Sequence, residues 1–303
     1  MLLTYKLTTK EITMTVPANQ VNSDAMNAAL DQEMIANFNQ EYSRLAEILG
    51  IFAPEVMQAG QALQQVKITG ELNTEAYTEG DEVPLSKYKA DLVPVGIITP
   101  KPYRKQTTAA AVLKSGYEVA ILRTDQKMLN NVRGNILSDF FTFLGKGTGT
   151  STGAGLQAAL VKADAVLGDA MENNGDQAGA LVHFINRQDA ADYLGKAEIT
   201  TQNMFGLTYL ETFLGINNVF LTSKVPAGTL YVTPVENIHV YSIDFGALSN
   251  AGLAYASDSL GLIGVAHTPT YDHVSADTNV LCGTLFFPEI QNYIIKGEIA
   301  ATA

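Results

Sequence analysis

Residues 124–144 read TDQKMLNNVRGNILSDFFTFL, and this stretch decides the fold. Its apolar residues recur at steps of three and four, as on one face of a helix: Met128, Leu129, Val132, Ile136, Leu137, Phe140, Phe141 and Leu144. Thr124 is the expected N-cap, Asp125 places negative charge at the positive end of the helix dipole, and Gly145 is expected to close the helix in a left-handed conformation. The pattern therefore predicts one amphipathic helix, about 30 Å long, weakened at Gly134 by up to ~1 kcal/mol relative to alanine.

The bulk composition is that of a folded, acidic protein. The chain has 303 residues, 47% hydrophobic and 17% charged, enough for one large domain or two modest ones. Its net charge of −12 opposes tight binding to nucleic acid and docking on an anionic membrane. We find no membrane-spanning apolar run and no secretory signal at residues 1–14. Cys282 is the single cysteine, so no disulfide can form within one chain, which fits a reducing compartment.

The first segments are predicted to be an arm and a helix. Residues 1–22 carry a weak strand pattern broken at Pro17, and residues 23–49 carry a helical stripe closed by Gly50. This helix could pack on its own domain or lie beneath a neighbouring subunit. Both positions are compatible with its pattern.

Residues 66–100 predict a long flap with Gly80 at its tip. Four nearby prolines exclude a helix and restrict strands to sheet edges: Pro84, Pro94, Pro100 and Pro102. A two-stranded flap with few bulky core residues is not stable alone in water. It therefore needs a surface to lie on. That surface is either its own domain, which would make the flap a lid, or a neighbouring subunit.

The chain after the flap predicts helices and strands in alternation. Residues 107–114 read as a short helix, and the glycine-rich run 145–155 reads as a flexible hinge. A helix at 156–171, a strand at 180–185 and helical turns at 189–194 suggest a small α/β domain. Further extended segments are expected at 219–222, 229–233 and 236–241. Two long strands, at 280–287 and 293–299, are expected to return and pack against the helix at 124–144.

No motif in the sequence supports catalysis or metal binding. GKGTGT at 145–150 lacks the order of a phosphate-binding loop, in which lysine is followed by serine or threonine. The four histidines show no zinc-ligand spacing, and His267 and His273 are expected in an exposed strand connection. The acidic run 71–82 lacks the spacing of a calcium loop. Cys282 lies in an apolar strand and is expected to be a buried, inert thiol.

The acidic flap tip is a candidate contact with a basic patch on another subunit. The acidic candidates are Glu75, Glu79, Asp81 and Glu82. The basic candidates lie just after the flap or near the long helix, and they are Lys101, Arg104, Lys105, Arg123, Lys127 and Arg133. Exposed ion pairs contribute only about 0–1 kcal/mol each, so docking would depend on many weak contacts around a closed assembly. The alternative is a solvated tip.

The order of these elements and several short stretches resemble the major capsid protein of tailed bacteriophages, which has the Hong Kong 97 fold. The stretches are EGDEVPLSKY at 79–88, RTDQKMLNNV at 123–132, DFFTFLGKGTGT at 139–150, DAADYLG at 189–195, LTSKVPAGTLYVTPVENIHVY at 221–241 and GTLFFPE at 283–289. The resemblance spans most of the chain from about residue 60 and implies an α+β fold.

The resemblance implies five segments along the chain. They are an N-terminal arm and helix (1–60), an extended loop (61–106), a peripheral domain with the spine helix (107–150), an axial α/β domain (151–261) and returning strands of the peripheral domain (262–303). The long helical scaffolding segment that some members carry before the arm is absent, so either a separate scaffolding protein assists assembly or the segment was cleaved, and Met1 at the start favours the former.

The implied function is structural. Subunits of this family have no catalytic centre, so we expect no enzyme activity, no metal and no cofactor. Copies would form pentamers and hexamers of an icosahedral virion shell, assembled in the host bacterial cytoplasm with a scaffolding protein and a portal. The shell would enclose double-stranded DNA without sequence recognition and without a membrane. The alternatives are an encapsulin-like compartment shell, or a small-molecule-binding protein or enzyme built on residues 156–241.

Overall fold

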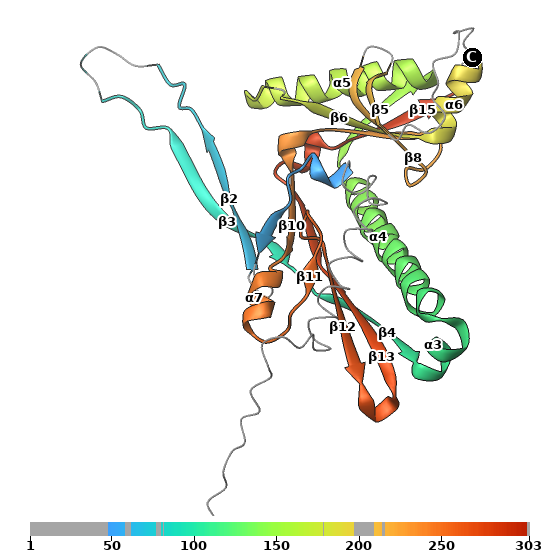
Figure 1. The fold of residues 1–303 in the computed structure, drawn as a ribbon. Helices are drawn as coiled ribbons and strands as arrows, with labels where there is room; N and C mark the ends of the chain where they lie inside the picture. The colour runs from blue at the N-terminus through green and yellow to red at the C-terminus, as the bar shows by residue number, and fades with distance from the viewer. Residues whose placement is uncertain are drawn as a thin grey trace, which may run out of the picture.

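The computed structural model describes residues 48–57, 62–76, 80, 82–177, 179–196, 209–213 and 216–301. The arm predicted at 1–22 and all but the end of the helix predicted at 23–49 lie outside these residues; Ile48, Leu49 and Gly50 are helical. Figure 1 shows a long helix joining a helix-covered sheet to a second group of strands, with a two-stranded flap projecting away from both.

The long helix, α4, runs from Arg123 to Leu144, and its buried residues include almost the whole predicted stripe. Its ends differ from the prediction. A π-helical turn, Glu118–Leu122, leads directly into α4, so Thr124 is not an N-cap, and its hydroxyl donates to the carbonyl of Ala120 at 2.8 Å. Gly145 is right-handed, with φ −62°, because the chain continues through a further helical turn instead of reversing at a left-handed residue.

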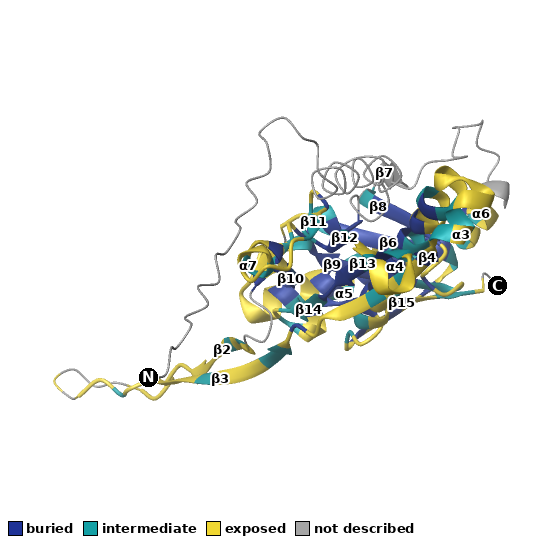
Figure 2. Cartoon of the chain, turned by 60° about the horizontal axis from the view of Figure 1, so that its bottom comes forward, coloured by how far each residue is buried: buried dark blue, intermediate teal, exposed yellow. Residues whose placement is uncertain are grey.

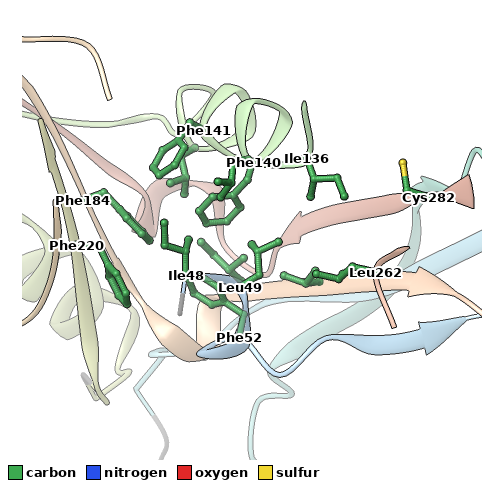
Figure 3. Close-up of a cluster of buried hydrophobic side chains, with 14 of the residues drawn as sticks. Ile48, Leu49, Phe52, Ile136, Phe140, Phe141, Phe184, Phe220, Leu262 and Cys282 are labelled. Carbon is green, nitrogen blue, oxygen red and sulfur yellow. The ribbon is translucent and has the colours of Figure 1, made fainter. Parts of the chain in front are cut away.

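The centre of the core is a group of aromatic rings around Phe140, which is completely buried. Its ring lies 5.7 Å from Phe184 and 5.4 Å from Phe286 between centroids, in edge-on geometry. Such pairs add about 0.5–1.5 kcal/mol beyond area burial. Ile48 and Leu49 pack into the same cluster (Figure 3). The core therefore ties α4 to strands from both parts of the molecule.

The helix-covered sheet has six strands in the order β5-β15-β9-β6-β8-β7. These strands are β5 (Gly149–Ala154), β15 (Ile295–Ala300), β9 (Thr229–Pro234), β6 (Leu181–Asn186), β8 (Ile216–Thr222) and β7 (Tyr209–Phe213). Helix α5 (Gly155–Asn174) packs on strands β5, β15 and β9 of this sheet, and α6 (Arg187–Lys196) lies beside β6 and β8. The strand and helix predictions at 156–233 are confirmed to within a few residues.

The hinge predicted at 145–155 is wrong for most of its length. Residues Gly149–Ala154 form strand β5, which pairs in parallel with β15. Glycine is required here by close packing rather than by flexibility. A Cβ on Gly153 would lie 2.3 Å from the main-chain nitrogen of Ala159 in α5, and one on Gly149 would meet Ile295 and the backbone of Asn292. This glycine-rich segment, which has the composition of a linker, therefore forms a closely packed edge strand.

The second group of strands forms two sheets beside α4. One sheet has the order β11-β12-β13-β4, and the other has the order β1-β10-β14. These strands are β11 (Ala256–Ser257), β12 (Ile263–Thr270), β13 (Ser275–Cys282), β4 (Lys101–Thr108), β1 (Glu55–Met57), β10 (Ile238–Ile243) and β14 (Thr284–Pro288). Two short helices, α3 (Ala109–Ser115) and α7 (Phe245–Asn250), lie at the ends of these sheets.

The C-terminal segment differs from the single returning unit predicted at 262–303. The strand predicted at 280–287 is divided at Gly283 into β13 and β14, which belong to different sheets. Both pack against α4, as predicted. Strand β15 instead joins the six-stranded sheet between β5 and β9. At Gly283, where the two strands separate, the backbone packs closely against Ile243: a Cβ on this glycine would lie 2.5 Å from the Ile243 side chain.

Gly153→Ala and Gly134→Ala should have opposite effects on stability. Overpacking against the backbone of α5 should lower the free energy of unfolding of Gly153→Ala by about 1–3 kcal/mol. Nothing lies within 4 Å of a Cβ on Gly134 in α4, so that variant should be more stable by up to ~1 kcal/mol. Urea unfolding of both variants measures the difference. Equal destabilisation would contradict the crowded-strand explanation.

Candidate assembly surface

The flap is an antiparallel hairpin of strands β2 (Ala62–Glu71) and β3 (Lys87–Ile97). The predicted extended structure is confirmed, and Gly80, with φ +98°, lies in the connection between the strands. Strand β4 begins four residues after β3 and belongs to another sheet, so the flap ends at Ile97, earlier than the predicted boundary at 106.

One face of the flap is apolar and exposed. Residues directly opposite in an antiparallel pair point to the same side, and sides alternate along each strand. Val66 lies opposite Leu92, and Ile68 lies two positions further on. Ile68 is 69% exposed and Leu92 is 66% exposed. These side chains lack the apolar cover that a folded subunit normally provides. Figure 2 shows most of the flap coloured as exposed.

Tyr88 completes the apolar face. It lies opposite Gly70, and a Cβ on that glycine would be 2.2 Å from the Tyr88 ring. The ring therefore lies across the glycine and fills the space that a side chain on β2 would occupy. An aromatic residue over a strand glycine stabilises the pairing at a position where glycine alone would weaken it.

The opposite face of the flap is charged and faces the body of its own chain. Lys67 lies opposite Asp91 and Glu71 opposite Lys87, while Lys89 and Asp91 form an ion pair of 2.7 Å. A groove of about 1270 Å³ separates this face from the end of α5 and the segment after β14. The flap residues that line it come mostly from the polar face, with three from the other face: Gln65, Lys67, Thr69, Glu71, Lys87, Lys89 and Val93, and Val66, Ile68 and Gly70.

The flap is not a lid on its own domain. Gln65 donates a hydrogen bond to the carbonyl of Glu289 at 3.2 Å, close to the base of the hairpin. Beyond that base the ribbon projects away from both groups of strands (Figures 1 and 2). Val66 and Ile68 border the groove but are more than half exposed, whereas Tyr88 and Leu92 lie outside it.

Of the acidic candidates at the flap tip, Glu75 and Glu82 are exposed. Glu79 and Asp81 lie outside the described residues. The side-chain oxygen of Asn73 accepts a hydrogen bond from the backbone amide of Glu75, and the backbone amide of Asn73 donates to the hydroxyl of Ser86 across the hairpin. The tip candidates remain a prediction about contacts with another subunit.

Four of the basic candidates have carboxylate partners within the chain. Lys101 pairs with Asp139 at 2.6 Å, Arg104 with Asp277 at 2.5 Å, and Arg123 with Glu118 at 3.2 Å. Lys105 contacts the completely buried Asp125. Lys127 is exposed and Arg133 is half-buried, both on α4. The pairs within the chain already offset much of the charge of Lys101, Arg104, Lys105 and Arg123. The role of all six basic candidates in contacts between subunits remains a prediction.

The buried carboxylate of Asp125 is a feature that the sequence did not indicate. It accepts hydrogen bonds from Thr278 at 2.8 Å and His267 at 3.1 Å, in addition to Lys105. Burial raises its pKa, but the bonds from His267, Lys105 and Thr278 outweigh burial and hold the pKa below its usual value. His267 lies in strand β12 and its side chain is largely buried, so the prediction that it lies in an exposed loop is wrong. The cluster fastens the start of α4 to strands β4, β12 and β13.

The thiol of Cys282 has a structural environment and not a reactive one. Cys282 is buried, as predicted, and burial raises the pKa of its thiol to about 11, which keeps it protonated and unreactive. In the part of the chain that the structure describes, no group of three His, Cys, Asp or Glu residues could hold a metal ion. No helix among the described residues has the length and apolarity to cross a membrane.

The solved structures that resemble this chain are viral capsids and related particles. No family model and no curated protein matches its sequence. The capsid of an empty GTA particle is 10% identical and has a TM-score of 0.58, covering 85% of this chain and 90% of its own. Cyanophage P-SCSP1u capsid is 11% identical (TM-score 0.54; coverage 82% and 87%), and Mycobacterium phage Che8 is 12% identical (TM-score 0.52; coverage 84% and 87%).

These likenesses establish the fold. The chain has the Hong Kong 97-like fold of phage capsid proteins, as the resemblance of its sequence to that family implied.

Proposed function

We propose that this chain is a major capsid protein whose copies assemble into the icosahedral head shell of a tailed bacteriophage. The observation that carries the proposal is the apolar flap face, on which Ile68, Tyr88 and Leu92 are exposed and of which Tyr88 and Leu92 lie outside the groove against their own chain. An exposed apolar strip of this kind marks an interaction site. A hairpin without a partner is marginally stable. A neighbouring copy supplies both the apolar cover and the support, and the capsid fold makes such a neighbour the expected partner.

The proposal extends to partners and location. Pentamers and hexamers of the chain form the shell, a separate scaffolding protein and a portal assist its assembly, and double-stranded DNA is enclosed. The net charge of −12 favours holding DNA by enclosure rather than by phosphate contacts. Assembly takes place in the host cytoplasm and the product is the virion shell. The role is structural and not enzymatic.

We also propose a division of the described chain into three working parts. The flap, Ala62–Ile97, is the extended loop. The peripheral domain contains α4 and the sheets beside it. The axial domain contains the six-stranded sheet, including β15, so residues 295–300 move from the peripheral to the axial domain relative to the division expected from sequence. Strands β10 and β11 move in the opposite direction, because they belong to the sheets beside α4.

Particle imaging tests the proposal directly. We expect purified protein, alone or with its scaffolding protein, to form closed shells that are visible by electron microscopy and large by light scattering. Monomers and small oligomers under all these conditions would refute the proposed function. Shells that carry a cargo protein, with no portal and no DNA, would instead identify an encapsulin-like compartment.

A further inference from the structure

The end of helix α5 carries the single Asn-Gly pair of the chain, Asn174 followed by Gly175. Asparagine before glycine is prone to deamidation, because no side chain on the glycine hinders the attack of its backbone nitrogen on the asparagine side chain. Asn174 is the last residue of α5, and Gly175 is its C-cap, with φ +77°. Both residues are exposed, and Asn174 also lines the groove beside the flap. Water, which the reaction consumes, therefore reaches the pair.

Two hydrogen bonds occupy the groups that would react. The backbone amide of Gly175, whose nitrogen is the nucleophile, donates to the carbonyl of Glu172 at 3.0 Å. The side-chain amide of Asn174, whose carbon is attacked, donates to the hydroxyl of Tyr293 at 2.8 Å. Ring closure needs both groups free, because the nitrogen and the side chain must turn toward each other. The reaction therefore proceeds from a conformation in which the last turn of α5 has opened locally.

Tyr293 is the residue outside α5 that keeps this turn closed. It is buried just before strand β15, and its hydroxyl donates to the carboxylate of Asp176 while it accepts from Asn174. Burial raises the pKa of Tyr293, and the bond to Asp176 raises it further, so the hydroxyl remains protonated. A protonated phenol has one proton to donate. The hydroxyl therefore links the residues on either side of Gly175, and its only proton is already used.

Deamidation reverses the role of position 174 in this network. The amide donor becomes a carboxylate, which only accepts. The one proton of Tyr293 cannot serve carboxylates at positions 174 and 176 together, so a hydrogen bond is lost and two like charges face one hydroxyl. The new charge also lies at the C-terminus of α5, the negative end of the helix dipole. The modified turn is therefore less stable than the original one.

We propose that Asn174 is a site of spontaneous deamidation, and that Tyr293 restrains the reaction by holding the last turn of α5 closed. The nitrogen of Gly175 forms a bond to the side-chain carbon of Asn174, its proton passes to the departing nitrogen, and ammonia leaves a cyclic imide. Water then adds to either carbonyl of the imide and breaks one carbon–nitrogen bond, which gives aspartate or isoaspartate. The reaction needs no partner copy, so the inference stands apart from the proposed function.

Timed peptide mass spectrometry on the full-length subunit tests the site. Protein is kept at mildly alkaline pH, either folded in buffer or unfolded in guanidinium chloride, and the mass gain from replacing NH2 by OH is followed. In the unfolded chain we expect the reaction at Asn174 and not at Asn173, whose following residue has a side chain. In the folded chain it should be at least about tenfold slower, since opening breaks two hydrogen bonds. Equal rates at the two asparagines, or equal rates in the two states, would overturn the inference.

Two tyrosine variants test the restraint. Tyr293→Phe removes one buried hydroxyl and should speed the reaction in the folded chain about three- to tenfold, the ratio that corresponds to one net hydrogen bond. Tyr193→Phe is the matched control, because its hydroxyl contacts Gln157 near the other end of α5, at 3.4 Å. The rate at Asn174 should be unchanged in this control. An unchanged rate in Tyr293→Phe, or the same acceleration in both variants, would overturn the restraint.

A second pair of variants tests the consequence without depending on the tyrosines. Asn174→Asp installs one product of the reaction directly, and Asn173→Asp adds the same charge to the neighbouring exposed residue of α5. The melting temperature of Asn174→Asp should be the lower of the two, because only this change removes a hydrogen bond to Tyr293. Equal melting temperatures would contradict the part assigned to Tyr293.

Discussion

Replacing Ile68 and Leu92 together with aspartate should abolish shell formation without unfolding the subunit. Both side chains are exposed on the apolar flap face, so the substitution should change the stability of the isolated chain by only about 0.5 kcal/mol at each position. In an assembled shell the same positions would be covered by a neighbour. Burying an unpaired carboxylate there costs several kcal/mol per contact, and the cost recurs in every subunit.

The opposite flap face provides the control for this prediction. Thr69→Asp with Val93→Asp adds the same two charges to the same two strands, but on the opposite, charged face, most of whose residues line the groove. This variant should still form shells, since the groove already contains charged groups. Light scattering and electron microscopy measure assembly, and circular dichroism checks the fold. Shells from the Ile68/Leu92 variant would remove the apolar face from the assembly mechanism.

Asp125→Ala should destabilise the subunit by about 3–5 kcal/mol, the usual cost of removing one partner of a buried ion pair. Asp125 is completely buried, and its loss leaves Lys105 and the hydroxyl of Thr278 without their shared acceptor. Asp139→Ala is the control, because Asp139 pairs with Lys101 at the surface, where both side chains are about half exposed. That change should cost about 1 kcal/mol or less. Urea unfolding measures both, and similar losses would contradict a special role for the buried cluster.

The effect of Asp125 should depend on pH in a defined direction. Its pKa in the folded chain is below the ordinary value, so the unfolded chain binds the proton more readily. The stabilisation is therefore fully present above the unfolded pKa of about 4 and is lost as pH falls through the folded pKa. The stability difference between wild type and Asp125→Ala should shrink below about pH 4. A difference that stays constant from pH 7 to pH 2 would contradict this assignment.

The features that the sequence determined are those with local patterns. The stripe of α4 follows from apolar residues at helical spacing, and its buried residues are nearly those that the spacing predicted. The flap follows from prolines and glycines that exclude a helix, and its apolar face follows from alternation once the strand register is known. The buried thiol of Cys282 follows from its apolar neighbours in β13.

The tertiary structure decided the features that depend on residues far apart in the chain. Gly145–Gly155 has the composition of a linker, yet the approach of α5 and the pairing with β15 make most of it a crowded strand. Asp125 has the position of a residue that stabilises a helix start, yet Lys105, His267 and Thr278 converge on it from three strands. Local patterns report which face of an element is apolar, because that depends on spacing alone. Which element covers that face, and whether another copy must do so, depends on distances between segments that no local pattern contains.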